Sequence, residues 1–234
     1  MSTPRPRVAV IVFPGSQDDR DAALALEAVG AEAVLVWHAE PELPSADAAI
    51  LPGGFSYGDY LRCGAIARFA PVMAAVSRFA ADGGPVLGIC NGFQVLCEAG
   101  LLPGVLRPNR GSRFVCRDVT LAVERAAPPF TSRCEPGQQL VIPVKHGEGC
   151  YFAAPDVLDE LEESGRVVLR YEAGDNPNGS LADIAGVVNA QGNVMGLMPH
   201  PEHAVDPLLG STDGAFLLGS LVDTARERVA VGIA

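Results

Sequence analysis

A cysteine between two glycines ends an apolar run in the segment Val86-Leu-Gly-Ile-Cys-Asn-Gly-Phe-Gln94. The run is typical of a buried strand, and the residues that follow return to a helical pattern. A tight turn between strand and helix lifts a side chain above a sheet, and Gly88 and Gly92 would relieve its crowding. The N-terminus of the following helix favours thiolate over thiol. The pattern therefore indicates that Cys90 is a nucleophile. A small buried cysteine beside two turn glycines remains the alternative.

A partner for this thiolate is offered far along the chain, in Gly196-Leu-Met-Pro-His-Pro-Glu202. A nucleophilic thiolate needs a base, and the base needs a group that orients it. We expect Pro199 and Pro201 to hold this segment extended, and in an extended segment side chains two residues apart point the same way. Glu202 would then fix the tautomer of His200 and stabilise its imidazolium. A surface histidine beside a solvated glutamate remains the alternative.

Acyl transfer also needs backbone N–H groups that can bind an oxyanion. One candidate is the N–H of Asn91, the residue after the cysteine. The other candidates lie in Leu51-Pro-Gly-Gly-Phe55, because a Gly-Gly turn at the end of a strand lets the backbone approach a substrate closely. Taken alone, this Gly-Gly pair indicates only a turn.

Alternating strand and helix patterns are expected to position these residues. Strands are predicted over residues 8–13, 34–37, 48–51 and 85–89, and helices over residues 22–29, 61–81 and 92–101. Ser16 and Asp19 resemble a capping box for the first helix. Such alternation predicts a parallel sheet with helices on both faces. Reactive groups gather beyond the carboxyl ends of the strands in these sheets, and Cys90 lies at such an end.

The second half of the chain has a different pattern, with strands and little helix between them. Strands are predicted over residues 114–123, 139–144, 167–171, 184–189 and 194–197, and a last helix over residues 212–228. Gln191-Gly-Asn193 is typical of a hairpin turn. We therefore predict an α/β fold with a mostly parallel central sheet, helices on its faces and an antiparallel extension. No linker or repeat interrupts the sequence, which predicts one domain over residues 1–234.

The composition excludes several classes of function. Asp and Glu number 28 against 17 Lys and Arg, and the formal net charge of -11 argues against nucleic acid or an anionic membrane as a partner. No segment is apolar over the ~18 residues that a membrane span needs. None of the six cysteines lies in a CxxC pair, and the four histidines show no zinc spacing. We expect free thiols, a cytoplasmic location and no metal.

The three segments, in this order, resemble the class I (triad) glutamine amidotransferases, which have a flavodoxin-like fold. Two longer stretches, Pro52–Gly64 and Pro199–Gly214, are similar to the glutaminase subunits of phosphoribosylformylglycinamidine synthase. Arg113–Arg117 and His146–Gly149 fit the same subunits. The resemblance covers nearly the whole chain. It is weaker at Lys145 and Cys150, where the family more usually has other residues.

The resemblance implies roles for the residues that match. Cys90 would attack the side-chain amide of L-glutamine and form a γ-glutamyl thioester, His200 would shuttle protons, and Glu202 would orient His200. The implied substrate-binding residues are Gly53, Gly54, Phe55, Asn91 and Gln94, with backbone N–H groups of Gly54, Phe55 and Asn91 around the oxyanion.

The resemblance also implies partners. The ammonia would pass to a synthetase subunit that uses ATP and magnesium to convert formylglycinamide ribonucleotide (FGAR) to formylglycinamidine ribonucleotide (FGAM) in de novo purine biosynthesis. A small third subunit would bridge the other two. The chain has no G-x-x-x-x-G-K-[ST] phosphate loop, so we expect no cofactor in this chain.

Other polar residues have weaker patterns. His146 is a rival base, but no carboxylate is placed beside it as Glu202 is beside His200, and a role toward substrate or a partner subunit is the alternative. We expect His203 to point away from Glu202, and His38 to be structural. The remaining polar residues of interest are surface groups or part of a synthetase interface: Tyr57, Asp59 and Arg62.

Two rival functions remain open from the sequence. One is a stand-alone cysteine hydrolase with the same strand-to-helix turn, although such proteins lack the late Pro-His-Pro-Glu segment. The other is an interaction subunit that keeps the fold without turnover. The presence of Cys90, His200 and Glu202 together argues against the second.

Overall fold

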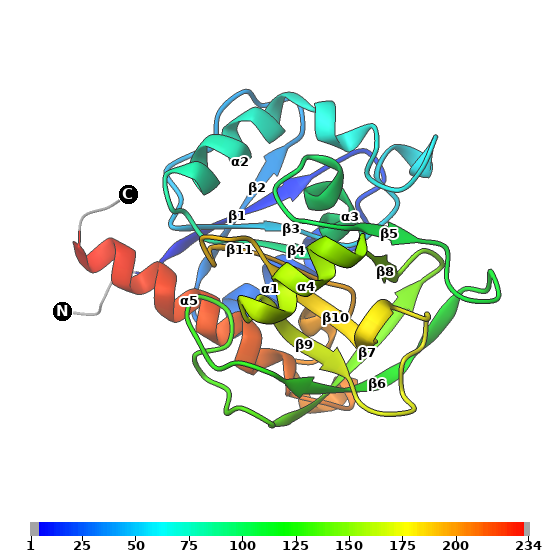
Figure 1. Ribbon diagram of the computed structural model, residues 1–234. Coiled ribbons are helices and arrows are strands. Elements are labelled where there is room, and N and C mark those ends of the chain that lie inside the picture. Colours follow the sequence, from blue (N-terminus) through cyan, green and yellow to red (C-terminus); the bar gives the residue numbers. More distant parts are fainter. Residues whose placement is uncertain (1–4, 232–234) are drawn as a thin grey trace.

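One nine-stranded sheet runs through residues 5–231, the part of the chain that the computed structural model describes (Figure 1). The strands lie in the order β2-β1-β3-β4-β11-β10-β9-β6-β7. They are β1 (Arg7–Val12), β2 (Glu32–Trp37), β3 (Ala48–Leu51), β4 (Val86–Ile89), β6 (Val115–Val123), β7 (Gln139–His146), β9 (Val167–Tyr171), β10 (Ile184–Val188) and β11 (Val194–Leu197). The pairings from β2 to β11 are parallel, and those from β11 to β7 are antiparallel. The predicted parallel core and antiparallel extension are confirmed.

Helices cover both faces of the parallel half of the sheet. They are α1 (Asp19–Ala28), α2 (Pro71–Ala81), α3 (Asn91–Glu98) and α5 (Gly214–Val231). α1 and α5 lie against one face, and α2 and α3 against the other (Figure 1). Because both faces are covered, every residue of β3, β4 and β11 is buried, which explains their apolar sequences. Within residues 5–231, no helix combines the length and the apolar character that crossing a membrane requires.

One edge of the sheet collects the residues that follow the parallel strands. Asp18 lies in the loop after β1, Gly53 after β3, Cys90 after β4 and His200 after β11. Strand β7 also reaches this edge, because the backbone N–H of His200 donates to the carbonyl of Pro143 at 2.8 Å. The topology therefore brings together side chains that are far apart in the sequence, such as Asp18 and His200, which are 182 residues apart.

The antiparallel half contains both predicted and unpredicted elements. The hairpin β10–β11 turns at Gln191-Gly-Asn193, as predicted. Three of the strands and α-helices were not predicted: the strands β5 (Val105–Arg107) and β8 (Cys150–Phe152), which pair with each other, and the helix α4 (Pro155–Glu163). Three-residue strands are too short to show an alternating pattern. α4 has only three apolar residues, Val157, Leu158 and Leu161, among five acidic ones, and of these only Leu161 is fully buried.

Two local predictions at helix starts are wrong. The helix predicted over residues 61–81 begins at Pro71, because Leu61 and Gly64 have positive φ angles of 70° and 78° that break any helix. The capping box at Ser16 is absent. The hydroxyl of Ser16 instead accepts a hydrogen bond from the N–H of Phe13 at 3.0 Å, and α1 begins after Asp18 with no side-chain cap.

Candidate active site

Cys90 occupies the strained turn between β4 and α3. Its φ of 51° and ψ of -104° are unusual for a residue other than glycine. The turn depends on its glycines, because a Cβ atom on Gly92 would lie 1.9 Å from the carbonyl oxygen of Leu51. A Cβ atom on Gly88 would lie 2.7 Å from the carbonyl oxygen of Gly92. The sequence thus forces the cysteine to the edge of the sheet where the parallel strands end.

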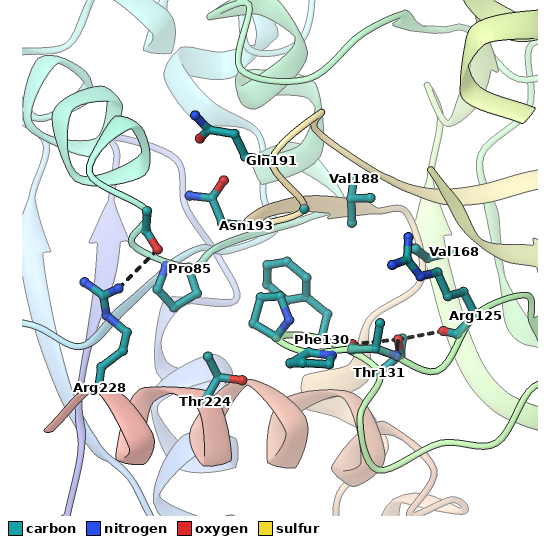
Figure 2. Close-up of a pocket in the computed structure, with 15 residues that line it drawn as sticks. Pro85, Arg125, Phe130, Thr131, Val168, Val188, Gln191, Asn193, Thr224 and Arg228 are labelled. Carbon is teal, nitrogen blue, oxygen red and sulfur yellow. Dashed lines mark hydrogen bonds between the residues drawn. The ribbon is translucent and has the colours of Figure 1, made fainter. Parts of the chain in front are cut away.

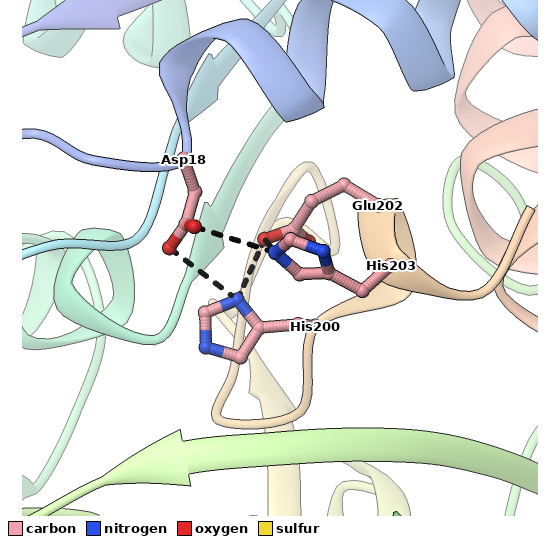
Figure 3. A group of neighbouring side chains, drawn as sticks. All are labelled: Asp18, His200, Glu202 and His203. Atoms are coloured by element: carbon pink, nitrogen blue, oxygen red, sulfur yellow. Dashed lines mark hydrogen bonds and ion pairs between the residues drawn. The ribbon is translucent and has the colours of Figure 1, made fainter. Parts of the chain in front are cut away.

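His200, which lines the same cavity as Cys90, forms a buried pair with Glu202 (Figure 3). Nδ1 of His200 lies 2.6 Å from Oε1 of Glu202, and both side chains are almost fully buried. The predicted extended segment is wrong, since Pro201–His203 form a 3₁₀ helix. The pair forms through this turn and not through strand alternation. Because Glu202 occupies Nδ1, Nε2 is the atom of the ring that remains for chemistry.

The charges around His200 favour its imidazolium form. Burial lowers the pKa of His200, but the charges of Glu202 and Cys90 outweigh burial and raise the pKa to about 10. Nε2 has no hydrogen-bond partner among the described residues. The ring therefore has one nitrogen held by a carboxylate and the other without a partner among the described residues.

A cavity of about 260 Å³ joins Cys90 to His200, so no core separates the two side chains. Its lining includes Gln17, Asp18, Gly54, Phe55, Asp59, Cys63, Gln94, Phe114, Lys145, His146, Gly147 and Glu148. Gln94 is held in place, because its amide nitrogen donates to the carbonyl of Glu148 at 2.6 Å and its amide oxygen accepts from Asn91 at 2.9 Å.

Of the five residues predicted to bind substrate, Gly54, Phe55 and Gln94 line the cavity, whereas Gly53 and Asn91 do not. A Cβ atom on Gly53 would meet Asp18 and His200, so this glycine lies behind the cavity wall. The side-chain oxygen of Asn91 accepts from the N–H of Ser56 at 3.1 Å, which leaves its backbone N–H as the group able to face an oxyanion.

The predicted oxyanion donors are incomplete in this structure. The N–H of Phe55 donates to the carbonyl of Gly15 at 2.9 Å, so, contrary to the prediction, this donor is not free. The N–H of Asn91 opens helix α3, where the first N–H groups have no acceptor within the helix. Among residues 5–231, the N–H of Gly54 has no backbone acceptor. Two of the three predicted donors therefore remain available.

His146 lines the same cavity but lacks the features of a base with an orienting group. Burial, followed by the charge of His200, lowers the pKa of His146 to about 3. Its Nε2 lies 3.0 Å from the side-chain nitrogen of Asn178, which donates to it. A neutral, acceptor histidine of this kind shapes the cavity wall.

Asp18 and Lys145 belong to the site, although no role was predicted for either residue. The Asp18 side chain is 4% exposed; its Oδ2 lies 3.7 Å from Nδ1 of His200 and its Oδ1 lies 2.5 Å from Nζ of Lys145. His203 also turns toward Asp18, at 3.3 Å, and not away from the cluster as predicted. The cluster has four members, and each offers one nitrogen or carboxylate oxygen within 4.8 Å of those of the others: Asp18, His200, Glu202 and His203 (Figure 3). The position of Asp18 after a parallel strand was the one available signal.

A second cavity of about 290 Å³ lies at the opposite end of the sheet, near Pro85 before β4 and Asn193 before β11 (Figure 2). Arg125 and Arg228 are its charged residues, and its lining contains no cysteine, histidine or carboxylate. Unlike the cavity at Cys90, this cavity therefore has no thiol, imidazole or carboxylate in its lining.

Comparison with known proteins first gives the protein class to which the chain belongs. Residues 5–213 match the family described as the CobB/CobQ-like glutamine amidotransferase domain. This match covers most of the chain and agrees with the mixed sheet and with a cysteine, a histidine and a glutamate gathered at the strand ends. The chain is an enzyme subunit of the glutamine amidotransferase class.

Relatives that are similar over nearly the whole chain identify the family within this class. Phosphoribosylformylglycinamidine synthase subunit PurQ of Rubrobacter xylanophilus is 63% identical over 94% of this chain and 99% of its own length. The same subunit of Nocardia farcinica is 63% identical over 93% of this chain and 97% of its own length. The solved structure of PurLQS from Thermotoga maritima includes a chain with a TM-score of 0.86 and 45% identity, covering 94% of this chain and 99% of that one. The chain belongs to the PurQ family of phosphoribosylformylglycinamidine synthase subunits.

Proposed function

We propose that the chain hydrolyses L-glutamine to glutamate and ammonia as the glutaminase subunit of phosphoribosylformylglycinamidine synthase. The single observation that carries this proposal is the cavity shared by Cys90 and His200, with Glu202 on the other nitrogen of the imidazole. The family gives the wider reaction. The ammonia passes to a synthetase subunit, which holds ATP and magnesium and converts FGAR to FGAM in de novo purine biosynthesis. A small third subunit bridges the two.

The proposed reaction has two halves. In the first, Sγ of Cys90 attacks the side-chain carbonyl carbon of glutamine, and Nε2 of the His200 imidazolium donates a proton to the leaving nitrogen. Ammonia leaves and a γ-glutamyl thioester remains. In the second, neutral His200 takes a proton from water as the water attacks the thioester. The new carboxyl group releases its proton to solvent, glutamate leaves, and the thiolate–imidazolium pair is restored. Glu202 holds the Nδ1–H throughout and does not take the proton.

Two donors support the oxyanion in each half. The N–H of Asn91 points from the start of α3, where the helix dipole also favours negative charge. The N–H of Gly54 lies on the facing loop. The third predicted donor, the N–H of Phe55, would join them only if it released the carbonyl of Gly15. We infer that docking of the synthetase subunit makes this change, so that glutamine is cleaved when the acceptor of ammonia is present.

The location of the reaction follows from the same proposal. All six cysteines are free thiols: Cys63, Cys90, Cys97, Cys116, Cys134 and Cys150. A nucleophilic cysteine among so many thiols suits a reducing compartment. We therefore place the proposed glutaminase in the cytoplasm.

Replacement of the nucleophile tests the proposal. Cys90→Ala, assembled with the synthetase and the small subunit, is expected to lose glutamine-dependent FGAM formation by at least about a thousandfold, as for other catalytic triads. FGAM formation from added ammonium chloride is expected to stay unchanged, because the synthetase does that chemistry. Both rates are measured on the same preparation.

Cys116→Ala is the matched control, since Cys116 is an exposed cysteine on β6 outside the cavity. It is expected to keep both rates. An equal fall of the glutamine-driven and ammonia-driven rates in Cys90→Ala would contradict the assigned role. Labelling of Cys90 by a glutamine-analogue electrophile, followed by peptide mass spectrometry, separates a glutaminase from a cysteine hydrolase of other substrates.

A further inference from the structure

The ion pair of Asp18 and Lys145 lies against the catalytic histidine and has no part in the steps above. Asp18 faces Nδ1 of His200 at 3.7 Å with one carboxylate oxygen and Nζ of Lys145 at 2.5 Å with the other. We propose that Asp18, balanced by Lys145, is a positioning residue that acts through His200, setting the orientation of its ring and how tightly it holds its proton. This inference rests on the proposed glutaminase function and deepens it.

The loop that carries Asp18 is fixed by the loop that carries Gly53. The backbone N–H groups of Gln17 and Asp18 both donate to the carbonyl of Gly53, at 3.2 and 3.3 Å. A Cβ atom on Gly53 would lie 2.4 Å from Oδ2 of Asp18 and 2.7 Å from Cε1 of His200. Only glycine at position 53 therefore lets the carboxylate approach the imidazole this closely, and the approach is a built feature of two loops.

Asp18 remains ionised despite its burial. Burial would raise the pKa of Asp18, but the hydrogen bond from His203, the charge of His200 and the bond and charge of Lys145 together lower it well below its ordinary value. A buried carboxylate needs such partners, since an unpaired buried charge is strongly destabilising. Coulomb attraction is mutual, so the carboxylate that His200 stabilises also stabilises the imidazolium.

The positive charge of Lys145 offsets the effect of the Asp18 carboxylate on His200. Glu202 and Asp18 together would hold the His200 proton tightly, and an acid that holds its proton too tightly donates it slowly to a leaving group. The ammonium of Lys145 offsets one of these two negative charges. With His200 protonated and Cys90 a thiolate, Asp18, Glu202 and Cys90 face Lys145 and His200, and removing Asp18 and Lys145 together leaves the net charge of this group unchanged. The charged or titratable groups that face His200 from the surrounding elements are Asp18, Cys90, Lys145, His146, Glu202 and His203.

The test removes the charge of Asp18, the charge of Lys145, or both charges together. Asp18→Asn, Lys145→Met and the double variant are assembled with the synthetase and small subunit, and glutamate release is measured. Each single variant is expected to lower kcat by about tenfold to a hundredfold, with KM nearly unchanged, because a misplaced catalytic group slows chemistry more than binding. The double variant, which restores the charge balance, is expected to recover most of the loss.

A titration gives a readout that a merely structural role would not move. NMR titration of the His200 imidazole in the isolated chain is expected to show a lower pKa in Asp18→Asn and a higher pKa in Lys145→Met than in the unaltered chain. The opposite signs follow from removing a negative and a positive charge. Asp47→Asn is the matched control: Asp47 is also a buried aspartate, but it accepts from the N–H of Arg7 at the other end of the sheet.

Several results would overturn the inference. An unchanged kcat and an unchanged His200 titration in both single variants would do so while leaving the proposed function intact. A raised KM with unchanged kcat in Lys145→Met would instead make Lys145 a substrate-binding residue. If Asp18→Asn does not fold, Lys145→Met alone decides, because Lys145 is one-third exposed. If the unaltered complex releases no glutamate, the proposed function fails, and the NMR titrations still decide whether the pair acts on His200.

Discussion

At the scale of single residues, the site depends on charges held out of water. His200 and Glu202 are almost fully buried, and a buried imidazolium is stable only with a carboxylate bonded to it. The raised pKa of His200 is therefore also a statement about the stability of the fold, because the folded chain holds a proton that the unfolded chain releases. The proton on His200 that the proposed reaction uses therefore also stabilises the folded chain.

This linkage predicts a dependence of stability on pH. The pKa of His200 is about 10 in the folded chain against 6.5 for an ordinary histidine. Because the folded value is raised, the stabilisation is complete below pH 6.5 and is lost as the pH rises through about 10. The free energy of unfolding, measured in urea at pH 6.5 and pH 9.5, is expected to fall by about 2–4 kcal/mol more in the unaltered chain than in His200→Gln. Titrating groups away from His200 are common to both chains and cancel. Equal pH slopes would show that His200 is not protonated in the folded chain.

At the scale of elements, the sequence predicts those features of the site that are set by residues adjacent in the chain. The turn at Cys90 could be predicted because its steric requirement is met by glycines two residues away on each side. The pairing of His200 with Glu202 was also predicted, although the local conformation is a 3₁₀ turn and not an extended segment. Asp18 escaped prediction because its partners, Lys145 and His200, lie 127 and 182 residues away and leave no local pattern.

The contact between α3 and β3 gives a prediction at the same scale. Gly92→Ala would place a Cβ atom 1.9 Å from the carbonyl oxygen of Leu51, and backbone cannot yield as a flexible side chain can. We expect α3 to move away from β3, with a loss of about 1–3 kcal/mol in the free energy of unfolding. Glutamate release is expected to fall sharply, because Cys90 moves with the helix.

Gly100→Ala separates this steric effect from backbone strain. Gly100 follows the same helix with a φ of 72°, and a Cβ atom there would have no neighbour within 4 Å. Urea unfolding is expected to show a cost of about 1–2 kcal/mol from the left-handed conformation, with glutamate release retained. Similar activity of Gly92→Ala and Gly100→Ala would mean that the close contact of α3 with β3 does not position the nucleophile.

At the scale of the whole molecule, the cavity opens beside exposed apolar side chains. Tyr60, Leu61 and Phe114 are 74%, 90% and 56% exposed, and Phe114 itself lines the cavity. Tyr57, Asp59 and Leu61 in this segment also have positive φ angles, a cost that a surface loop without function has no reason to carry. Exposed apolar groups around an active site are typical of a protein interface. The proposed synthetase would cover this surface and reach the oxyanion loop at Phe55.

Docking at this surface predicts how the activity depends on the partner. Glutamate release by the chain alone is expected to be at least about tenfold slower than in the complete complex with ATP and FGAR, because the N–H of Phe55 is bonded to Gly15 in the free chain and we propose that docking releases it. Leu61→Asp is expected to remove most of this stimulation, since a charge would be buried in the interface. Leu24→Asp is the matched control, because Leu24 is 64% exposed on α1 and does not line the cavity. Equal glutamate release with and without the synthetase would mean that the site is complete in the free chain, and that the bond between Phe55 and Gly15 does not limit it.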